Sequence, residues 1–149
     1  MLSPALINEA RIGQGLEIAS KKRLLETLAE LLANDHPRLS TETVFERLLE
    51  RERLGSTGLG HGVALPHARV KDVSHVIGAF VQTTRGVDYD AADGEPVDLA
   101  FALLVPETAT EEHLQLLAYL AGRFSESATR SRLRDADSPA VILDLLKAT

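Results

Sequence analysis

Two nearly continuous apolar runs, residues 76–81 and 97–105, constrain the fold of this chain more than any other feature. A strand that is apolar along both of its faces is typical of sheets that are covered on both sides by helices. Residues 63–65 predict a further strand, and the turn-rich segment 88–96 separates the two long ones, with a short strand near residues 87–89. We therefore expect an α/β fold in which helices flank both faces of a mixed sheet.

Helical periodicity begins at Ser20, where leucines recur on one face: Leu24, Leu25, Leu28, Leu31 and Leu32. A second helix, capped by Ser40 or Thr41, would bury Val44, Phe45, Leu48 and Leu49. A capping box over residues 108–111 predicts a third, and shorter helices are expected at residues 126–134 and 138–147. The first 18 residues lack a clear period and predict only an edge strand around residues 5–8.

Composition excludes several classes of function. The 149 residues are 44% hydrophobic and contain no repeat or linker, so one domain spanning residues 1–149 is expected. A formal net charge of -6 opposes nucleic-acid binding, and a chain without cysteine has neither disulfides nor a thiol nucleophile. With no signal peptide and no apolar run of about 20 residues, direct membrane insertion is not expected, and a cytoplasmic location is.

The segment 60–67 carries the candidate chemistry, because a short apolar run passes through Pro66 onto the imidazole of His67. Neutral imidazole is nucleophilic near neutral pH, since its ordinary pKa is about 6.5. The glycine-rich loop before it lets the backbone approach an anion closely. Its candidate phosphate-loop residues are Ser56, Thr57, Gly60, His61 and Gly62. Phosphoryl transfer to His67 is the reaction that uses both features.

Arg51 and His113 are candidate partners of His67. Arg51 lies seven residues after Val44 and three after Leu48, and therefore on the apolar stripe of its helix, where it could clamp an anion or reach the C-terminal carbonyls of that helix. His113 lies in the first turns of the third helix, where it could serve the site or contact solvent. In-line phosphoryl transfer needs positioning and stabilised equatorial oxygens, which an arginine and a second imidazole supply.

The sequence resembles a known family over nearly its whole length. The segment 51–67, together with residues 96–106 and 112–114, resembles the IIA domains of the bacterial phosphotransferase system, fructose/mannitol class, and most of all its nitrogen-regulatory members. The resemblance implies an α/β sandwich around a mixed sheet. It also implies that His67 is the phosphorylated histidine, His113 the second active-site histidine and Arg51 the phosphate-facing arginine.

The resemblance also implies partners. Phosphate would come from an HPr-like (NPr-type) phosphocarrier supplied by an enzyme I-type kinase that uses phosphoenolpyruvate. The output would be regulatory target proteins bound according to phosphorylation, or an EIIB component in a sugar-specific system. No cofactor and no metal are expected. His61 departs from the family, whose nitrogen-type members usually carry asparagine between these two glycines.

Three alternatives stay open from the sequence. The chain could be a sugar-specific EIIA that passes phosphate to an EIIB. It could instead be a zinc protein, because His61, His67 and His113 would suffice for a catalytic zinc with an open position. It could also be an interaction domain in which His67 is incidental.

Overall fold

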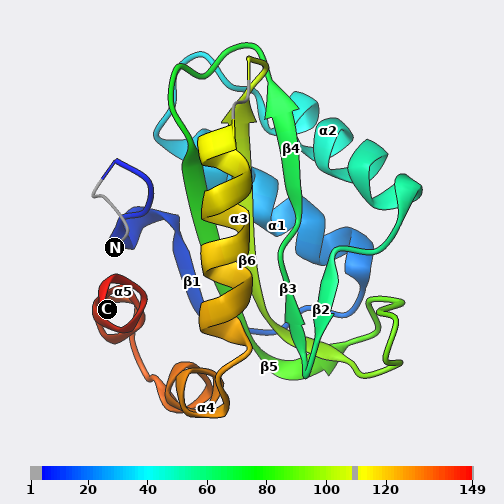
Figure 1. Cartoon of the computed structure of the whole chain (residues 1–149), viewed down its shortest axis with the longest axis vertical. Helices are drawn as coiled ribbons and strands as arrows, with labels where there is room; N and C mark the ends of the chain where they lie inside the picture. Colours follow the sequence, from blue (N-terminus) through cyan, green and yellow to red (C-terminus); the bar gives the residue numbers. More distant parts are fainter. Residues whose placement is uncertain (1–4, 109–110, 149) are drawn as a thin grey trace.

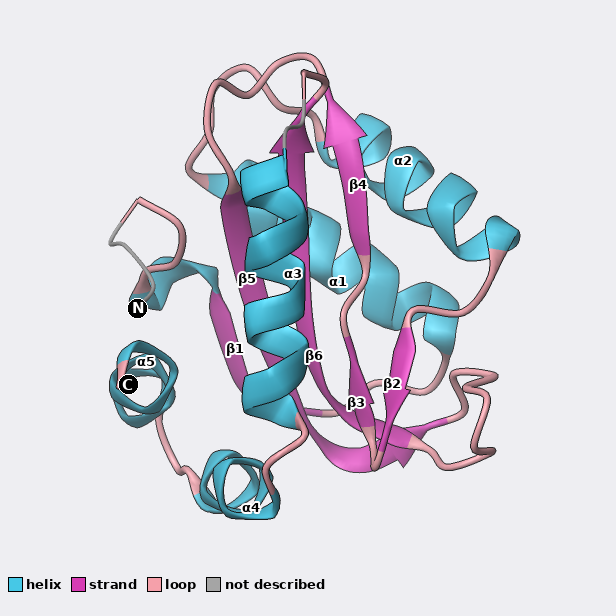
Figure 2. Cartoon of the chain, viewed as in Figure 1, coloured by secondary structure: helices cyan, strands magenta, loops and turns pink. Residues whose placement is uncertain are grey.

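The computed structural model of the chain describes residues 5–108 and 111–148. Six strands of this described part form one sheet (Figures 1 and 2), and they are β1 (Ile12–Leu16), β2 (Gly58–Gly60), β3 (Val63–Ala64), β4 (His67–Val70), β5 (Ile77–Val87) and β6 (Val97–Pro106). The order across the sheet is β1-β5-β6-β3-β2, and β4 also pairs with β6. The two apolar runs thus form the neighbouring strands β5 and β6.

The sheet is mixed, as the sequence predicts. β1 runs parallel to β5, β5 runs antiparallel to β6, and both β3 and β4 run parallel to β6. β2 pairs antiparallel with β3 at one edge. Among the described strands, β4 pairs only with β6, so its other side is an open edge of the sheet in this part of the chain.

Helices cover both faces of the sheet, which confirms the expected fold class. Figure 1 shows α1 (Lys21–Asn34) and α2 (Thr41–Leu54) behind the sheet and α3 (Glu111–Phe124) in front of it. The C-terminal helices α4 (Ser127–Asp135) and α5 (Pro139–Lys147) follow α3, and a short 3-10 helix, Glu9–Arg11, precedes β1. Within residues 5–108 and 111–148, no helix is long and apolar enough to cross a bilayer.

Serine side chains cap three of the helices. Ser20, Ser40 and Ser138 each accept a hydrogen bond from the backbone N–H three residues further on, at 3.1, 3.1 and 3.2 Å. These bonds satisfy N–H groups that the helix itself leaves without an acceptor. The capping box predicted for α3 cannot be compared, because residues 109–110 lie outside the described part of the chain.

Side chains along β6 alternate between two core clusters, one on each face of the sheet. Leu99, Phe101 and Leu103 point toward α3–α5, whereas Ala100 and Ala102 point toward α1 and α2. The small side chains let the fully buried leucines of α1 approach the sheet closely. On the opposite face, Phe101 packs its ring edge-on to Phe80, with the ring centroids 6.1 Å apart.

β3 and β4 run in one register along β6, and this register places the candidate nucleophile. Val63 lies opposite Leu99, and four residues later His67 lies opposite Leu103, so the pairing does not slip across the break at Pro66. Since neighbouring residues across a sheet share a face, His67 lies with Leu103 on the face that α3 covers.

The N-terminal segment differs from the prediction. Residues 5–8 do not form a strand, and the edge strand is instead Ile12–Leu16. The Leu6 carbonyl accepts from the Gly78 N–H at 2.6 Å, as in a strand pair. The Gly78 carbonyl, however, accepts from Nε of the buried Arg11 at 2.9 Å, so the guanidinium takes an acceptor that a continued strand pairing would use.

Arg11 also makes an ion pair that should give the fold an acid-sensitive contribution. Its Nη1 lies 2.8 Å from a carboxylate oxygen of Asp35. Partial burial raises the pKa of Asp35, but hydrogen bonds from Arg11 and Asn8 and the charge of Arg11 outweigh it, so the net pKa is lowered. A lowered folded-state pKa means that this stabilisation is complete above the unfolded value of about 3.9 and is lost as the pH falls through the folded value.

We therefore expect Asp35→Asn to lower the urea midpoint of unfolding at pH 6 but to approach wild type below about pH 4. Urea titrations of the two proteins between pH 3 and pH 7 measure this convergence. A difference between the two midpoints that stays constant across this range would contradict the assignment.

Candidate functional site

His67 is the first residue of β4, and its ring is held in one tautomer. The side chain is half-buried, and Nδ1 lies 2.8 Å from the Leu65 carbonyl oxygen. A carbonyl oxygen only accepts hydrogen bonds, so Nδ1 carries the proton and donates it. In the neutral ring, Nε2 is then left with its lone pair, which makes Nε2 the nucleophilic atom.

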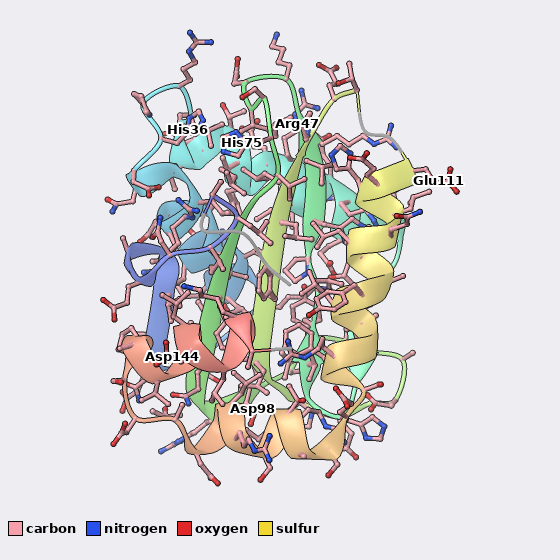
Figure 3. The ribbon with its side chains drawn as sticks, turned by 60° about the vertical axis from the view of Figure 1, so that its left-hand side comes forward. His36, Arg47, His75, Asp98, Glu111 and Asp144 are labelled. Atoms are coloured by element: carbon pink, nitrogen blue, oxygen red, sulfur yellow. The ribbon has the colours of Figure 1, made fainter. Side chains whose placement is uncertain are left out.

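His67 lies in a cleft between the open edge of the sheet and two helices. Arg51 from α2 and His113 from α3 line the same cavity, which has a volume of about 760 Å³. Arg47 and Glu111 line it as well, and Figure 3 labels both at the end of the molecule opposite Asp98. The structure thus brings together the three residues that the sequence singles out.

Arg51 makes the helix-end contact that the sequence allowed, and it also faces the cavity of His67. Its Nη1 donates to the carbonyl of Gly55, just beyond the end of α2, at 2.8 Å. The same side chain lines the cavity of His67. A guanidinium has five N–H donors in a planar fork, so one bond to Gly55 fixes its orientation and leaves others for an anion.

The cavity is more basic than the chain around it. Three arginines, Arg47, Arg51 and Arg69, line it together with two glutamates, Glu50 and Glu111. Arg47 and Glu50 form an ion pair of 3.5 Å, but both side chains are at least half exposed, so water screens this pair. In a chain with a net charge of -6, this excess of positive charge favours an anionic ligand here.

Ser56 and Thr57 lie beside the site, in a second cavity of about 350 Å³ that Arg51 and His67 also line. Ser56 accepts a hydrogen bond from Gly58 N–H at 3.1 Å. Thr57 is buried, and its hydroxyl and its N–H both bond to the carboxylate of Glu52. The hydroxyl of Thr57 is therefore committed to the protein interior.

The structure does not bring Gly60, His61 and Gly62 to His67. Gly60 ends β2, His61 and Gly62 form the turn between β2 and β3, and these two turn residues line a different cavity, with Asp98 and Arg134. His67 lies five residue steps beyond Gly62 along extended chain, a separation of about 16 Å. The placement therefore argues against this part of the predicted phosphate loop.

Side chains of the same chain already bond to the backbone of this turn. The His61 N–H donates to a carboxylate oxygen of Asp93 at 2.9 Å, and the His61 carbonyl accepts from Arg134. His61 and both glycines have positive φ, and a Cβ at residue 62 would lie only 2.5 Å from the Arg134 guanidinium. The turn therefore requires glycine for its own geometry.

Two exposed leucines border the cavity, and sequence reasoning missed them. Leu54 is 85% exposed at the end of α2, and Leu114 is 64% exposed on α3. The sequence also gave no weight to Arg69, although the two-residue period of a strand places residue 69 on the same face as His67. Arg47 could have been found by helical spacing, because it precedes Arg51 by one turn.

The zinc hypothesis required three imidazoles at one point. His67 and His113 share a cavity, but His61 lies in another one. Across residues 5–108 and 111–148, no group of three histidine or acidic side chains is placed to hold a metal ion. These three histidines therefore do not form the ligand set that the hypothesis assumed.

Comparisons with known proteins point to one family. The model of the phosphoenolpyruvate-dependent sugar phosphotransferase system, EIIA 2, matches residues 5–149. The nitrogen regulatory protein of Pseudomonas aeruginosa is 46% identical over 127 residues, which cover 85% of this chain and 82% of that protein. The nitrogen regulatory protein of Escherichia coli is 42% identical, over 87% and 80% of the two chains. The fructose-specific EIIA component of Haloferax volcanii is 34% identical, over 86% and 83%.

Solved structures agree with this comparison. The nitrogen regulatory protein IIA-Ntr of Neisseria meningitidis superposes with a TM-score of 0.89 at 46% identity, over 94% of this chain and 95% of that one. The mannitol IIA of Escherichia coli superposes with a TM-score of 0.78 at 25% identity, over 94% and 98% of the two chains.

Proposed function

Since the chain belongs to the EIIA type 2 family of the phosphoenolpyruvate-dependent sugar phosphotransferase system, we propose that it carries a phosphoryl group on Nε2 of His67. The single observation that best supports this is the hydrogen bond from Nδ1 to the Leu65 carbonyl, which leaves Nε2 as the free nucleophile in a basic cavity. The proposed donor is an HPr-like phosphocarrier of the NPr type.

The transfer needs no separate base. The Nε2 lone pair of His67 forms the new N–P bond while the N–P bond of the donor phosphohistidine breaks, and that bonding pair returns to the donor nitrogen. The His67 ring becomes a phosphorylated imidazolium, because Nδ1 keeps its proton, and the donor ring becomes a neutral imidazole. The Leu65 carbonyl stabilises the new positive charge through the Nδ1 hydrogen bond. Arg51 and His113 would bind the equatorial phosphoryl oxygens.

We propose a regulatory output rather than sugar uptake. The relatives described as nitrogen regulatory proteins are 46% and 42% identical to this chain, against 34% for the fructose-specific component. In this scheme, phosphorylation changes which target proteins the cavity face binds, because a dianion replaces an open basic site. The second candidate, supported by the fructose-specific relative, is a sugar-specific EIIA that passes the phosphoryl group to an EIIB.

Phosphate uptake tests the proposal directly. The protein is incubated with phosphoenolpyruvate, an enzyme I-type kinase and an NPr-type phosphocarrier, and its intact mass is measured by mass spectrometry. One added phosphoryl group that is acid-labile and maps to the peptide containing His67 is expected. A stable phosphate, or one on another residue, would refute the proposed role of His67. Subsequent transfer to a fructose-type or mannitol-type EIIB would favour the second candidate.

His113→Ala should slow phosphoryl transfer without removing the acceptor. The loss of one hydrogen bond to a phosphoryl oxygen, worth about 1.4 kcal/mol, corresponds to a rate about 10-fold lower. Quenched-flow measurements of phosphate uptake give the rate, and the final stoichiometry should still reach one phosphate per chain. A transfer rate equal to wild type would remove His113 from the proposed site.

A further inference from the structure

We propose that Glu52, a buried carboxylate outside the cavity of His67, is a positioning residue that holds the Leu65 carbonyl and thereby keeps the His67 ring in its reactive tautomer. This inference rests on the proposed function, in which Nε2 of His67 is the phosphoryl acceptor. Glu52 acts through a series of hydrogen bonds that passes through Thr57 and Leu65, and we call this series the relay.

The relay begins at the end of α2 and ends at the imidazole. The Glu52 carboxylate accepts from the Thr57 N–H at 3.2 Å and from the Thr57 hydroxyl. The Thr57 carbonyl accepts from the Leu65 N–H at 3.0 Å, and the Leu65 carbonyl accepts from His67 Nδ1 at 2.8 Å. In Figure 2, α2 leads into β2, which lies beside β3. Each bond restrains the residue whose next polar group continues the series.

Glu52 itself is held by a buried cluster. Its side chain is only 3% exposed, and its Oε1 lies 2.9 Å from Lys21 Nζ on α1. Lys21 also sits 4.4 Å above the ring of Tyr89, whose hydroxyl lies 3.0 Å from Thr57 Oγ1. A carboxylate buried this deeply persists as a charge only with partners of this kind.

The direction of the bonds in this cluster follows from the protons available. Thr57 has one hydroxyl proton and gives it to the carboxylate, which only accepts, so the Tyr89 hydroxyl must donate to Thr57 Oγ1. Burial, and then the charge of Glu52, raises the pKa of Tyr89, so the phenol keeps the proton that it donates. Tyr89 therefore supports the cluster without being part of the path to His67.

The relay matters for chemistry because it restrains the residue whose carbonyl binds the His67 ring. The Pro66 carbonyl accepts from the Leu103 N–H at 2.9 Å, which ties the segment between β3 and β4 to β6. On the other side, the bond from the Leu65 N–H to the Thr57 carbonyl restrains Leu65. If Leu65 turned, Nδ1 would lose its acceptor, and the His67 ring would take both tautomers and other orientations.

Ring-nitrogen NMR of the unphosphorylated protein tests the relay without any phosphate donor. In wild type, ¹⁵N shifts of His67 should show a protonated Nδ1 and an unprotonated Nε2. Glu52→Gln and Thr57→Val should shift both nitrogens toward the averaged values of a ring that exchanges between tautomers. The two variants should also take up phosphate about 10-fold more slowly, with an unchanged KM for the phosphocarrier.

Two matched variants separate positioning from general destabilisation. Tyr89→Phe removes a hydroxyl from the same buried cluster but leaves the relay intact, so it should keep wild-type ring shifts and transfer rate. Thr57→Ser keeps the hydroxyl that Thr57→Val lacks, so it should show the wild-type ring shifts and the wild-type transfer rate. If Glu52→Gln does not fold, the comparison of Thr57→Val with Thr57→Ser carries the test.

The outcomes are distinct for the relay and for the proposed function. Unchanged ring shifts in Thr57→Val would overturn the relay, as would a loss of rate that Tyr89→Phe shares. If wild type shows the single tautomer and Thr57→Val loses it, but no phosphate is taken up by wild type, the relay stands and the proposed function fails.

Discussion

His67→Ala should lose acid-labile phosphate uptake, with the transfer rate falling at least about 1000-fold. The reason is that alanine removes the atom that forms the new N–P bond in the proposed mechanism. Arg51 and His113 would still line the site, but in the proposed mechanism they stabilise the phosphoryl group and do not accept it. Intact-mass spectrometry after incubation with the phosphorylated carrier measures the uptake.

Two histidine variants provide controls for this loss. His75 is exposed and lies outside the cavity of His67, and Figure 3 labels it. His61 lies in the separate cavity beside Arg134. We expect His75→Ala and His61→Ala to reach one phosphate per chain at the wild-type rate. Full uptake by His67→Ala would refute the assignment of the acceptor.

Arg51→Leu should lower the transfer rate about 100-fold while the final phosphate stoichiometry stays at one. A charged donor that meets developing negative charge contributes more than a neutral one. The guanidinium is already oriented by its bond to Gly55, so little reorganisation is needed during transfer. Rapid-quench measurements at saturating phosphocarrier give the rate.

Arg53 is the matched control for Arg51. It lies in the same last turn of α2 and carries the same charge, but it is exposed and does not line the cavity. Arg53→Leu should keep the wild-type rate, and Arg51→Lys should recover only part of it, because an ammonium lacks the planar fork. Equal losses for Arg51→Leu and Arg53→Leu would mean that overall charge, and not a placed guanidinium, controls transfer.

The sequence predicted the elements of the fold well where the pattern had one physical cause. The leucine stripe after Ser20 and the run 97–105 became α1 and β6 because burial on one face or on both leaves a periodic signal. β5 was predicted to end at residue 81 but continues to Val87. Its polar Gln82 is buried because its amide donates to the carbonyls of Leu133 and Ala136, at 2.7 and 2.9 Å, and periodicity cannot reveal such partners.

For the site, too, some residues could be predicted from local sequence and others could not. His67, Arg51 and His113 could be chosen from residue type and local spacing, and the structure gathers them around one cavity. The glycines at positions 60 and 62 could not be interpreted locally, because a positive φ serves a tight turn as well as an anion loop. Only the contacts with Asp93 and Arg134 identify this turn as a structural one.

The sequence by itself determined the layered α/β fold and pointed to an imidazole as the proposed acceptor, because hydrophobic period and side-chain chemistry are local properties. The tertiary structure decided which atom of His67 is nucleophilic and what surrounds it. That choice depends on the position of the Leu65 carbonyl, which Thr57 and the distant Glu52 hold in place. A hydrogen bond requires atoms to meet within about 3 Å, and only the folded chain brings together groups from α2, β3 and β4 at that distance.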